Sequence, residues 1–232
     1  MVIVTGHRGC GTKGIGTLEP ENTVQSIVRA IGLGADQIEI DAQLTADHHV
    51  VVIHDETVDR TTDGSGRVAH YTLESIRNLD AGLGERIPTL EEVIDVARGK
   101  VVLQIELKGR DVQDEVVRIV KKRDMIDKVV LTSFRHEAVR KAKALEHRIR
   151  TGVLFLCAPV DSTQLAINAH ANNLHPNVDY VDSAMIDAAH RCGLKVFVWN
   201  ADTQEKAKEM LRYGVDGIGT NRLDLVLPLV KL

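Results

Sequence analysis

Cysteine is scarce in this sequence, and its scarcity limits the classes of protein to consider. The three cysteines, Cys10, Cys157 and Cys192, are odd in number and widely spaced over 232 residues. This spacing argues against a disulfide framework and against a cysteine-based zinc cluster, and it is typical of proteins in a reducing compartment. We therefore expect a cytoplasmic protein in which Cys10 is a small buried thiol.

Aromatic side chains, a basic surplus and long apolar runs are missing as well. Aromatic residues make up 3% of the chain and the formal net charge is −4, so it has neither a basic surface nor the rings that stack on bases. No run approaches the ~20 apolar residues of a membrane-spanning helix, and no positively charged leader precedes the first apolar run. The composition thus excludes a nucleic-acid partner and a membrane span.

The chain does contain a regular alternation of short β-branched runs with longer stretches of helical period. This alternation is typical of parallel strands joined by crossover helices. Nine strands are expected near Val2–Thr5, Gln37–Asp41, Val50–His54, Val101–Leu107, Val129–Thr132, Thr151–Leu156, Tyr180–Asp182, Lys195–Trp199 and Gly217–Thr220. Helices are expected at Thr23–Leu33 (with Asn22 as a candidate cap), Thr89–Ala97, Val112–Arg123, His136–Glu146, Ser162–Asn172, Ser183–Cys192 and Thr203–Tyr213.

One connection is too short for a crossover. Only residues 46–49 separate the second and third runs, whereas a parallel crossover needs a dozen residues or more. These two strands must form a hairpin, which places His54 opposite Asp41 to within about one residue. The remaining eight strands predict an α/β fold, a (β/α)₈ barrel in a single domain over residues 1–232. A cap-like insertion of about residues 56–88 then lies between strand two and helix two.

Polar side chains gather where the first strands end. Residues two apart on a strand share a face, and the carboxyl ends of barrel strands form the rim that carries active sites. We therefore expect one pocket containing three carboxylates, two imidazoles, a lysine and an arginine. These residues are His7, Arg8, Glu39, Asp41, His54, Glu106 and Lys108.

The three carboxylates predict one divalent cation. Glu39, Asp41 and Glu106 offer hard oxygen ligands without cysteine, so Mg²⁺ or Ca²⁺ is preferred and Mn²⁺ could substitute. Three carboxylates and such a cation carry about −1, and Arg8 and Lys108 add about +2. The surplus of about +1 matches an anionic phosphodiester.

Two histidines complete the expected chemistry. Diester cleavage needs a base for the attacking oxygen and an acid for the leaving alkoxide, and His7 and His54 suit both roles. Arg8 offers a bidentate grip on phosphate and Lys108 a point charge. Each of these residues alone would more often be structural, and only their joint placement favours a catalytic site. Trp199 suits core packing and a wall that contacts substrate equally well.

Other polar residues have simpler interpretations. The Asp-Gly-Ser-Gly run at 63–66 predicts a turn rather than a phosphate loop. The remaining histidines are expected at the surface or in turns: His48, His49, His70, His136, His147, His170, His175 and His190.

Seven ordered motifs resemble the glycerophosphodiester phosphodiesterase family. They are dense over the first half of the chain and looser after it, where Trp199 and residues 214–221 also look similar. The motifs are His7-Arg8-Gly9, Pro20-Glu21-Asn22-Thr23, Ile38-Glu39-Ile40-Asp41, Val52-Ile53-His54-Asp55, Arg60-Thr61-Thr62-Asp63-Gly64-Ser65-Gly66, Ile87-Pro88-Thr89-Leu90-Glu91-Glu92 and Ile105-Glu106-Leu107-Lys108.

The resemblance implies a (β/α)₈ barrel with an inserted cap that hydrolyses glycerophosphodiesters to sn-glycerol 3-phosphate and an alcohol. It implies His7 and His54 as the acid/base pair and Arg8 and Lys108 as phosphate binders. It implies metal ligation by Glu39, Asp41 and Glu106. It leaves open attack by water or by the neighbouring glycerol hydroxyl through a cyclic phosphate.

The chain departs from the family pattern in a longer, glycine-rich link at residues 10–19, which puts substrate preference in question. Two alternatives to the expected activity therefore remain. One is a lysophospholipase D or sphingomyelinase D-like phosphodiesterase acting on acylated substrates, and the other is a non-catalytic barrel that binds phosphate esters. The sequence does not determine the preferred head group or the oligomeric state.

Overall fold

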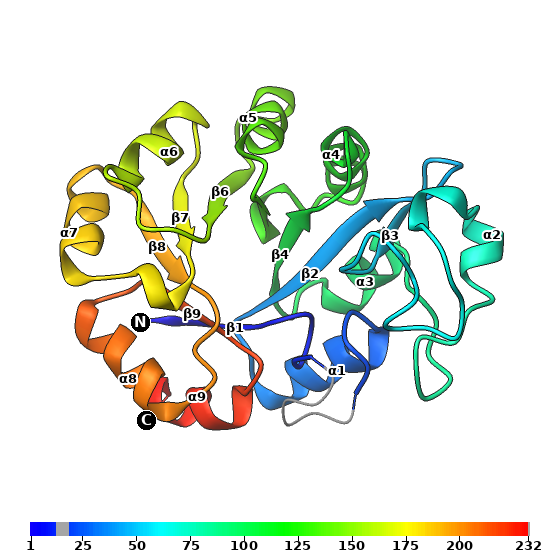
Figure 1. The fold of residues 1–232 in the computed structure, drawn as a ribbon, viewed down its shortest axis with the longest axis horizontal. Helices are drawn as coiled ribbons and strands as arrows, with labels where there is room; N and C mark the ends of the chain where they lie inside the picture. Colours follow the sequence, from blue (N-terminus) through cyan, green and yellow to red (C-terminus); the bar gives the residue numbers. More distant parts are fainter. Residues whose placement is uncertain (13–18, 232) are drawn as a thin grey trace.

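The parallel strands close into a barrel in the computed structural model, which describes residues 1–12 and 19–231 (Figure 1). The sheet has the order β1-β9-β8-β7-β6-β5-β4-β2-β3, and a parallel β1–β2 pairing closes the ring. Helices alternate with the strands and surround them. The fold is a TIM barrel, which confirms the predicted fold class. The glycine-rich link at residues 10–19 lies largely outside the described residues, because positions 13–18 are not among them.

The strands are β1 (Ile3–Gly6), β2 (Gln37–Leu44), β3 (Val50–Val52), β4 (Val102–Leu107), β5 (Val129–Ser133), β6 (Arg150–Phe155), β7 (Asn173–Pro176), β8 (Lys195–Val198) and β9 (Gly217–Thr220). The α-helices are α1 (Val24–Leu33), α2 (Leu73–Ile76), α3 (Leu90–Ala97), α4 (Val112–Lys122), α5 (His136–Leu145), α6 (Ser162–Asn168), α7 (Ser183–Arg191), α8 (Gln204–Tyr213) and α9 (Leu223–Val230).

Alternation along β2 separates the core from the site. Ile38 and Ile40 are fully buried and belong to the hydrophobic cluster that the helices share. The side chains between them point to the opposite face, because successive strand residues alternate. Glu39 and Asp41 therefore face the barrel interior, where Gln37 on the same face donates a hydrogen bond to Gln104 of β4.

The predicted hairpin is confirmed, because β3 pairs antiparallel with β2. Ala42 lies opposite Val52, and the Ile53 amide donates to the Asp41 carbonyl. The register therefore places His54 one residue beyond Asp41, within the predicted tolerance. After β3 the chain forms a small lobe beside the barrel (Figure 1). This insertion has its own apolar cluster of Val51, Ile53, Val58, Val68, Ile76, Ala81 and Ile87.

The prediction of a strand at Tyr180–Asp182 is wrong. Residues 178–180 form a short 3-10 helix, and the seventh barrel strand is β7, Asn173–Pro176. Helix α6 correspondingly ends at Asn168 instead of Asn172. The prediction failed because the Asn-Leu-His-Pro segment lacks β-branched residues. Its strand conformation depends on pairing with β6 and β8 instead.

His175, expected at the surface or in a turn, is buried on β7 with 2% exposure. Its ring stacks on Phe197 at 5.3 Å and occupies the space above Gly152, where a Cβ would lie 2.4 Å from the ring. Burial lowers the pKa of His175 to about 3. A neutral imidazole therefore fills the barrel interior, because the glycine on the neighbouring strand leaves room for it.

Two further helix predictions need correction. Thr23, rather than Asn22, caps α1, since its side chain accepts from the Ser26 amide. The last helix, α9, was not predicted. Among the helices of the described residues, none is both long and apolar enough to cross a bilayer.

Candidate active site

Three carboxylates meet at the carboxyl ends of β2 and β4. Asp41 and Glu106 are directly paired in the parallel β2–β4 register, and Glu39 lies two residues before Asp41 on the same face. One oxygen of each carboxylate lies within 4.8 Å of the others. The residues are almost fully buried, with exposures of 5% for Glu39, 0% for Asp41 and 9% for Glu106. Strand pairing thus builds the predicted acidic cluster.

This cluster has the chemistry of a cation site. Burial and the neighbouring Asp41 carboxylate raise the pKa of Glu106 to about 7, and the same two causes raise the pKa of Glu39 well above its ordinary value. Oδ1 of Asp41 is buried without a hydrogen-bond partner among the residues that the structure describes. Like charges and an unpaired acceptor both fit a hard divalent cation, which would neutralise the repulsion and use the free oxygen.

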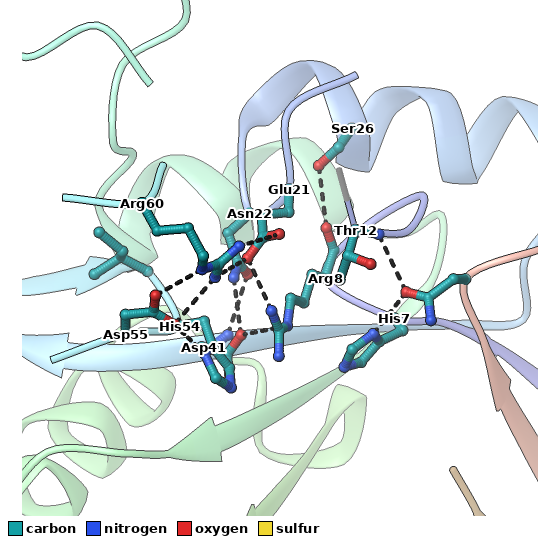
Figure 2. Close-up of polar contacts among 12 residues, drawn as sticks. His7, Arg8, Thr12, Glu21, Asn22, Ser26, Asp41, His54, Asp55 and Arg60 are labelled. Carbon is teal, nitrogen blue, oxygen red and sulfur yellow. Dashed lines mark hydrogen bonds and ion pairs between the residues drawn. The ribbon is translucent and has the colours of Figure 1, made fainter. Parts of the chain in front are cut away.

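His7 enters the site from the end of β1 with one ring nitrogen fixed (Figure 2). Asp202 accepts hydrogen bonds from the backbone N–H of Asn221 and from the side-chain Nδ2 of the same residue. The Asn221 side chain must therefore turn its oxygen toward His7. Nδ1 of His7 donates to that oxygen over 2.8 Å. Nε2 is left facing Glu39, 4.0 Å from its carboxylate. Burial, followed by the Arg8 guanidinium, lowers the pKa of His7 to about 4.

His54 follows the hairpin and lies on the side of the acidic cluster opposite to His7. Its Nδ1 lies 2.6 Å from Oδ1 of Asp55, and its Nε2 lies 3.0 Å from Nζ of Lys108. That ammonium group is 3.2 Å from Glu106 and 3.9 Å from Asp41. Both histidines therefore anchor Nδ1 on a neighbour, while Nε2 of His7 faces Glu39 and Nε2 of His54 faces the Lys108 ammonium group.

Arg8 lies between the two histidines, held by both its backbone and its side chain. Its amide donates to Glu39 over 2.8 Å, and Nη1 donates to Glu21 over 2.9 Å. Nε is 3.6 Å from Asp41 and makes no hydrogen bond within the described part of the chain. Asn22 supports the same carboxylate, because its Nδ2 donates to Asp41 over 2.8 Å. The guanidinium thus keeps a donor directed toward the acidic cluster.

A chain of charged hydrogen bonds runs from His54 to Arg8 (Figure 2). Arg60 of the insertion donates hydrogen bonds to Asp55 from Nε at 2.6 Å and from Nη2 at 3.0 Å. It also donates to Glu21, from Nη2 at 2.7 Å and from Nη1 at 3.0 Å. The Arg60 hydrogen bond, with that of His54, lowers the pKa of Asp55 well below its ordinary value. Burial alone would raise the pKa of Glu21, but hydrogen bonds from Arg60 and Arg8 lower it. Both carboxylates are therefore anions at neutral pH.

The acidic cluster, both histidines, Arg8 and Lys108 come together as predicted, but their supporting residues were missed. Glu21, Asn22, Asp55 and Arg60 lie within motifs that were recognised, but none of them was assigned to the site. Asn221 ends the run 214–221 that was noted as similar to the family, but its contact with His7 spans most of the chain. Asp202, which holds Asn221, gave no comparable local signal.

Trp199 lines the pocket at the acidic cluster, a cavity of about 190 Å³ that His7, His54, Glu39 and Glu106 also line. Its ring meets Phe134 edge to face at 5.5 Å, and its Nε1 donates to the His175 carbonyl over 2.9 Å. The indole is thus fixed as one wall of the pocket.

Comparison with known proteins adds independent evidence. A sequence model of the Glycerophosphoryl diester phosphodiesterase family matches residues 7–225. The chain is 37% identical to a glycerophosphodiester phosphodiesterase of Caldanaerobacter subterraneus, over 99% of this chain and 98% of that protein.

Solved structures agree. A phosphodiesterase of Oleispira antarctica in complex with the product sn-glycerol-3-phosphate aligns with a TM-score of 0.91 and 27% identity over 99% and 97% of the two chains. A glycerophosphodiester phosphodiesterase of Agrobacterium tumefaciens aligns with a TM-score of 0.86 and 29% identity over 98% and 100%.

The barrel and its acidic rim, taken with these matches, define an enzyme of the phosphoric diester hydrolase class. The chain belongs to the glycerophosphoryl diester phosphodiesterase family.

Arg60 provides a test of the supporting network. Arg60→Gln is expected to lower kcat by roughly tenfold, because Asp55 and Glu21 each lose a bidentate partner and no longer hold His54 and Arg8 rigidly. Arg60→Lys should recover little, since an ammonium cannot grip two carboxylates in the same plane. Steady-state kinetics with glycerophosphocholine, beside melting curves, would measure this. Arg86→Gln, an exposed arginine of the same insertion, is the matched control. Equal kcat values for wild type and Arg60→Gln would contradict the positioning role.

Proposed function

We propose that this enzyme performs the metal-dependent hydrolysis of glycerophosphodiesters to sn-glycerol 3-phosphate and an alcohol, with His7 and His54 as the proton-transfer pair. The supporting observation is that three buried carboxylates cluster at a pocket that two imidazoles line, each of which is held at Nδ1 by a neighbouring side chain. A divalent cation, Mg²⁺ or Ca²⁺ with Mn²⁺ as a substitute, would be held by Glu39, Asp41 and Glu106. When bound, it supplies positive charge for the developing charge on the phosphoryl oxygens.

The partners of the two histidines suggest different proton roles. The Asp55 carboxylate holds Nδ1 of His54 and orients its ring, so we assign His54 as the acid that protonates the leaving alkoxide. Burial and the Arg8 guanidinium lower the pKa of His7 to about 4 and so favour the uncharged ring, while Asn221 holds Nδ1, so His7 is the base that takes a proton from the attacking oxygen at Nε2. The attacking oxygen bonds to phosphorus as the bond to the alcohol oxygen breaks, and the alcohol leaves with the proton from His54. Attack by water gives sn-glycerol 3-phosphate directly, whereas attack by the neighbouring glycerol hydroxyl gives a cyclic phosphate that a water molecule then opens.

Arg8 and Lys108 orient the phosphodiester in this proposal. Arg8 keeps Nε free of hydrogen bonds to other described residues, and Lys108 sits between His54 and Glu106. Both cations can donate to non-bridging oxygens, which stabilises the charge that develops in the transition state. Trp199 and Phe134 would pack against the apolar carbons of the substrate.

The decisive experiment measures glycerol 3-phosphate release from glycerophosphocholine. The protein is stripped with a chelator and assayed again after Mg²⁺, Ca²⁺ or Mn²⁺ is restored. We expect no release from the stripped protein and full release with at least one cation. A strong preference for lysophosphatidylcholine would favour the lysophospholipase D-like alternative instead. Tight binding of the diester without turnover at any cation would favour the non-catalytic barrel.

A further inference from the structure

A second, larger cavity opens beside the catalytic pocket. It has a volume of about 670 Å³ and is lined by the end of β2, by the insertion and by the segments that follow β4 and β5. Lys108 joins the two spaces, because it lines the larger cavity while its Nζ contacts His54 and Glu106 of the catalytic pocket. A diester bound at the catalytic pocket would therefore have room for one of its two arms in this cavity.

The cavity is lined by more basic than acidic groups. Its cations are Arg67, Lys108, Arg110 and Arg135, and its acids are Glu56 and Asp111. Both acids are already paired, Glu56 with Arg67 at 2.7 Å and Asp111 with Lys141 at 3.4 Å.

Two of these guanidinium groups keep open donors. Within the described residues, the Arg135 side chain donates only to the Gly109 carbonyl, through Nη1 at 3.2 Å. The Arg110 side chain has no hydrogen bond or ion pair with residues 1–12 or 19–231. Arg110 and Arg135 are therefore the residues available to an anionic ligand.

We propose that this basic cavity holds the alcohol arm of the diester and selects alcohols that carry a further anionic group, in particular a phosphomonoester. The inference rests on the proposed function and adds the class of head group to it. A volume of several hundred Å³ accommodates an alcohol of the size of a phosphorylated cyclitol. Guanidinium groups bind phosphate through charge-assisted, often bidentate hydrogen bonds, and the added anion would lie where no unpaired carboxylate opposes it.

The most direct test compares two substrates that differ by one phosphate group, glycerophosphoinositol and glycerophosphoinositol 4-phosphate. The wild-type enzyme is expected to prefer the phosphorylated substrate by about tenfold in kcat/KM, an effect that falls as ionic strength rises. Arg110→Gln and Arg135→Gln should each reduce the preference and leave turnover of glycerophosphoinositol nearly unchanged. Arg118→Gln removes an exposed arginine of α4 that does not line the cavity, so it is the matched control.

Calorimetric binding of inositol 4-phosphate separates this inference from the proposed function, because it needs no turnover. Binding that weakens in Arg110→Gln and Arg135→Gln but not in Arg118→Gln supports the basic cavity, even if no diester is hydrolysed. Equal kcat/KM for the two substrates, or binding that none of the variants changes, overturns it. In that case turnover of glycerophosphoinositol still tests the proposed function.

Discussion

Replacing His54 by alanine is expected to lower turnover of glycerophosphocholine by about 10²–10⁴-fold with the fold intact, and His7→Ala should do the same. The reason is that each imidazole lines the pocket at the acidic cluster, while Asp55 or Asn221 fixes its Nδ1. Neither ring belongs to the apolar core, so circular dichroism and melting temperature should stay close to wild type. Near-normal turnover in either variant would remove that histidine from the mechanism.

The leaving group distinguishes the two histidines. A p-nitrophenyl ester of glycerol 3-phosphate releases an anion that needs no proton, so His54→Ala should recover most of its activity on this substrate. His7→Ala should not, because the attacking hydroxyl must still lose its proton. His147→Ala is the control, since that side chain is 87% exposed and remote from the acidic cluster. Equal recovery in both variants would contradict the assignment of acid and base.

Asp41→Asn is expected to abolish the response of the enzyme to divalent cations. Wild type at about 100 times the dissociation constant should gain about 2.7 kcal/mol. For a chain of this size, that gain corresponds to a rise in melting temperature of roughly 5–10 °C. The variant should show almost no rise, because it removes one negative charge and, with its remaining oxygen held by Asn22, places an NH₂ group where the unpaired oxygen of Asp41 lies. Differential scanning calorimetry with and without Mg²⁺, Ca²⁺ or Mn²⁺ measures the effect without reference to activity.

The same variant gives a second result of opposite sign. In chelator, Asp41→Asn should melt at or above wild type, since Asp41 is one of the like charges that raise the pKa values of Glu39 and Glu106. Glu74→Gln removes an exposed carboxylate of the insertion and should behave as wild type in both conditions. A wild-type protein that none of the three cations stabilises would contradict the metal proposal.

The acidic cluster could be predicted because it depends on strand geometry. Alternation puts Glu39 and Asp41 on one face, and parallel strands bring their carboxyl ends to one rim, so Glu106 must lie nearby. The short link before β3 likewise left only a hairpin, which delivered His54 to the cluster.

The hydrogen bonds that hold these residues in place could not be predicted from strand geometry or connection length. Glu21 and Arg60 are 39 residues apart, and His7 and Asn221 are 214 apart, so their pairing depends on how the insertion and the last strand close over the site. β7 shows the same limit, because its segment has weak strand propensity and becomes a strand through its neighbours.

The sequence by itself determined the barrel, the hairpin and the side chains that form the acidic cluster, because these depend on periodicity and on connection length. Only the tertiary structure decided which residues fix Nδ1 of each histidine, why His175 is buried above Gly152, and that a basic cavity adjoins Lys108. Those features arise from contacts between distant segments. No local pattern encodes such contacts, since they exist only once the ring has closed.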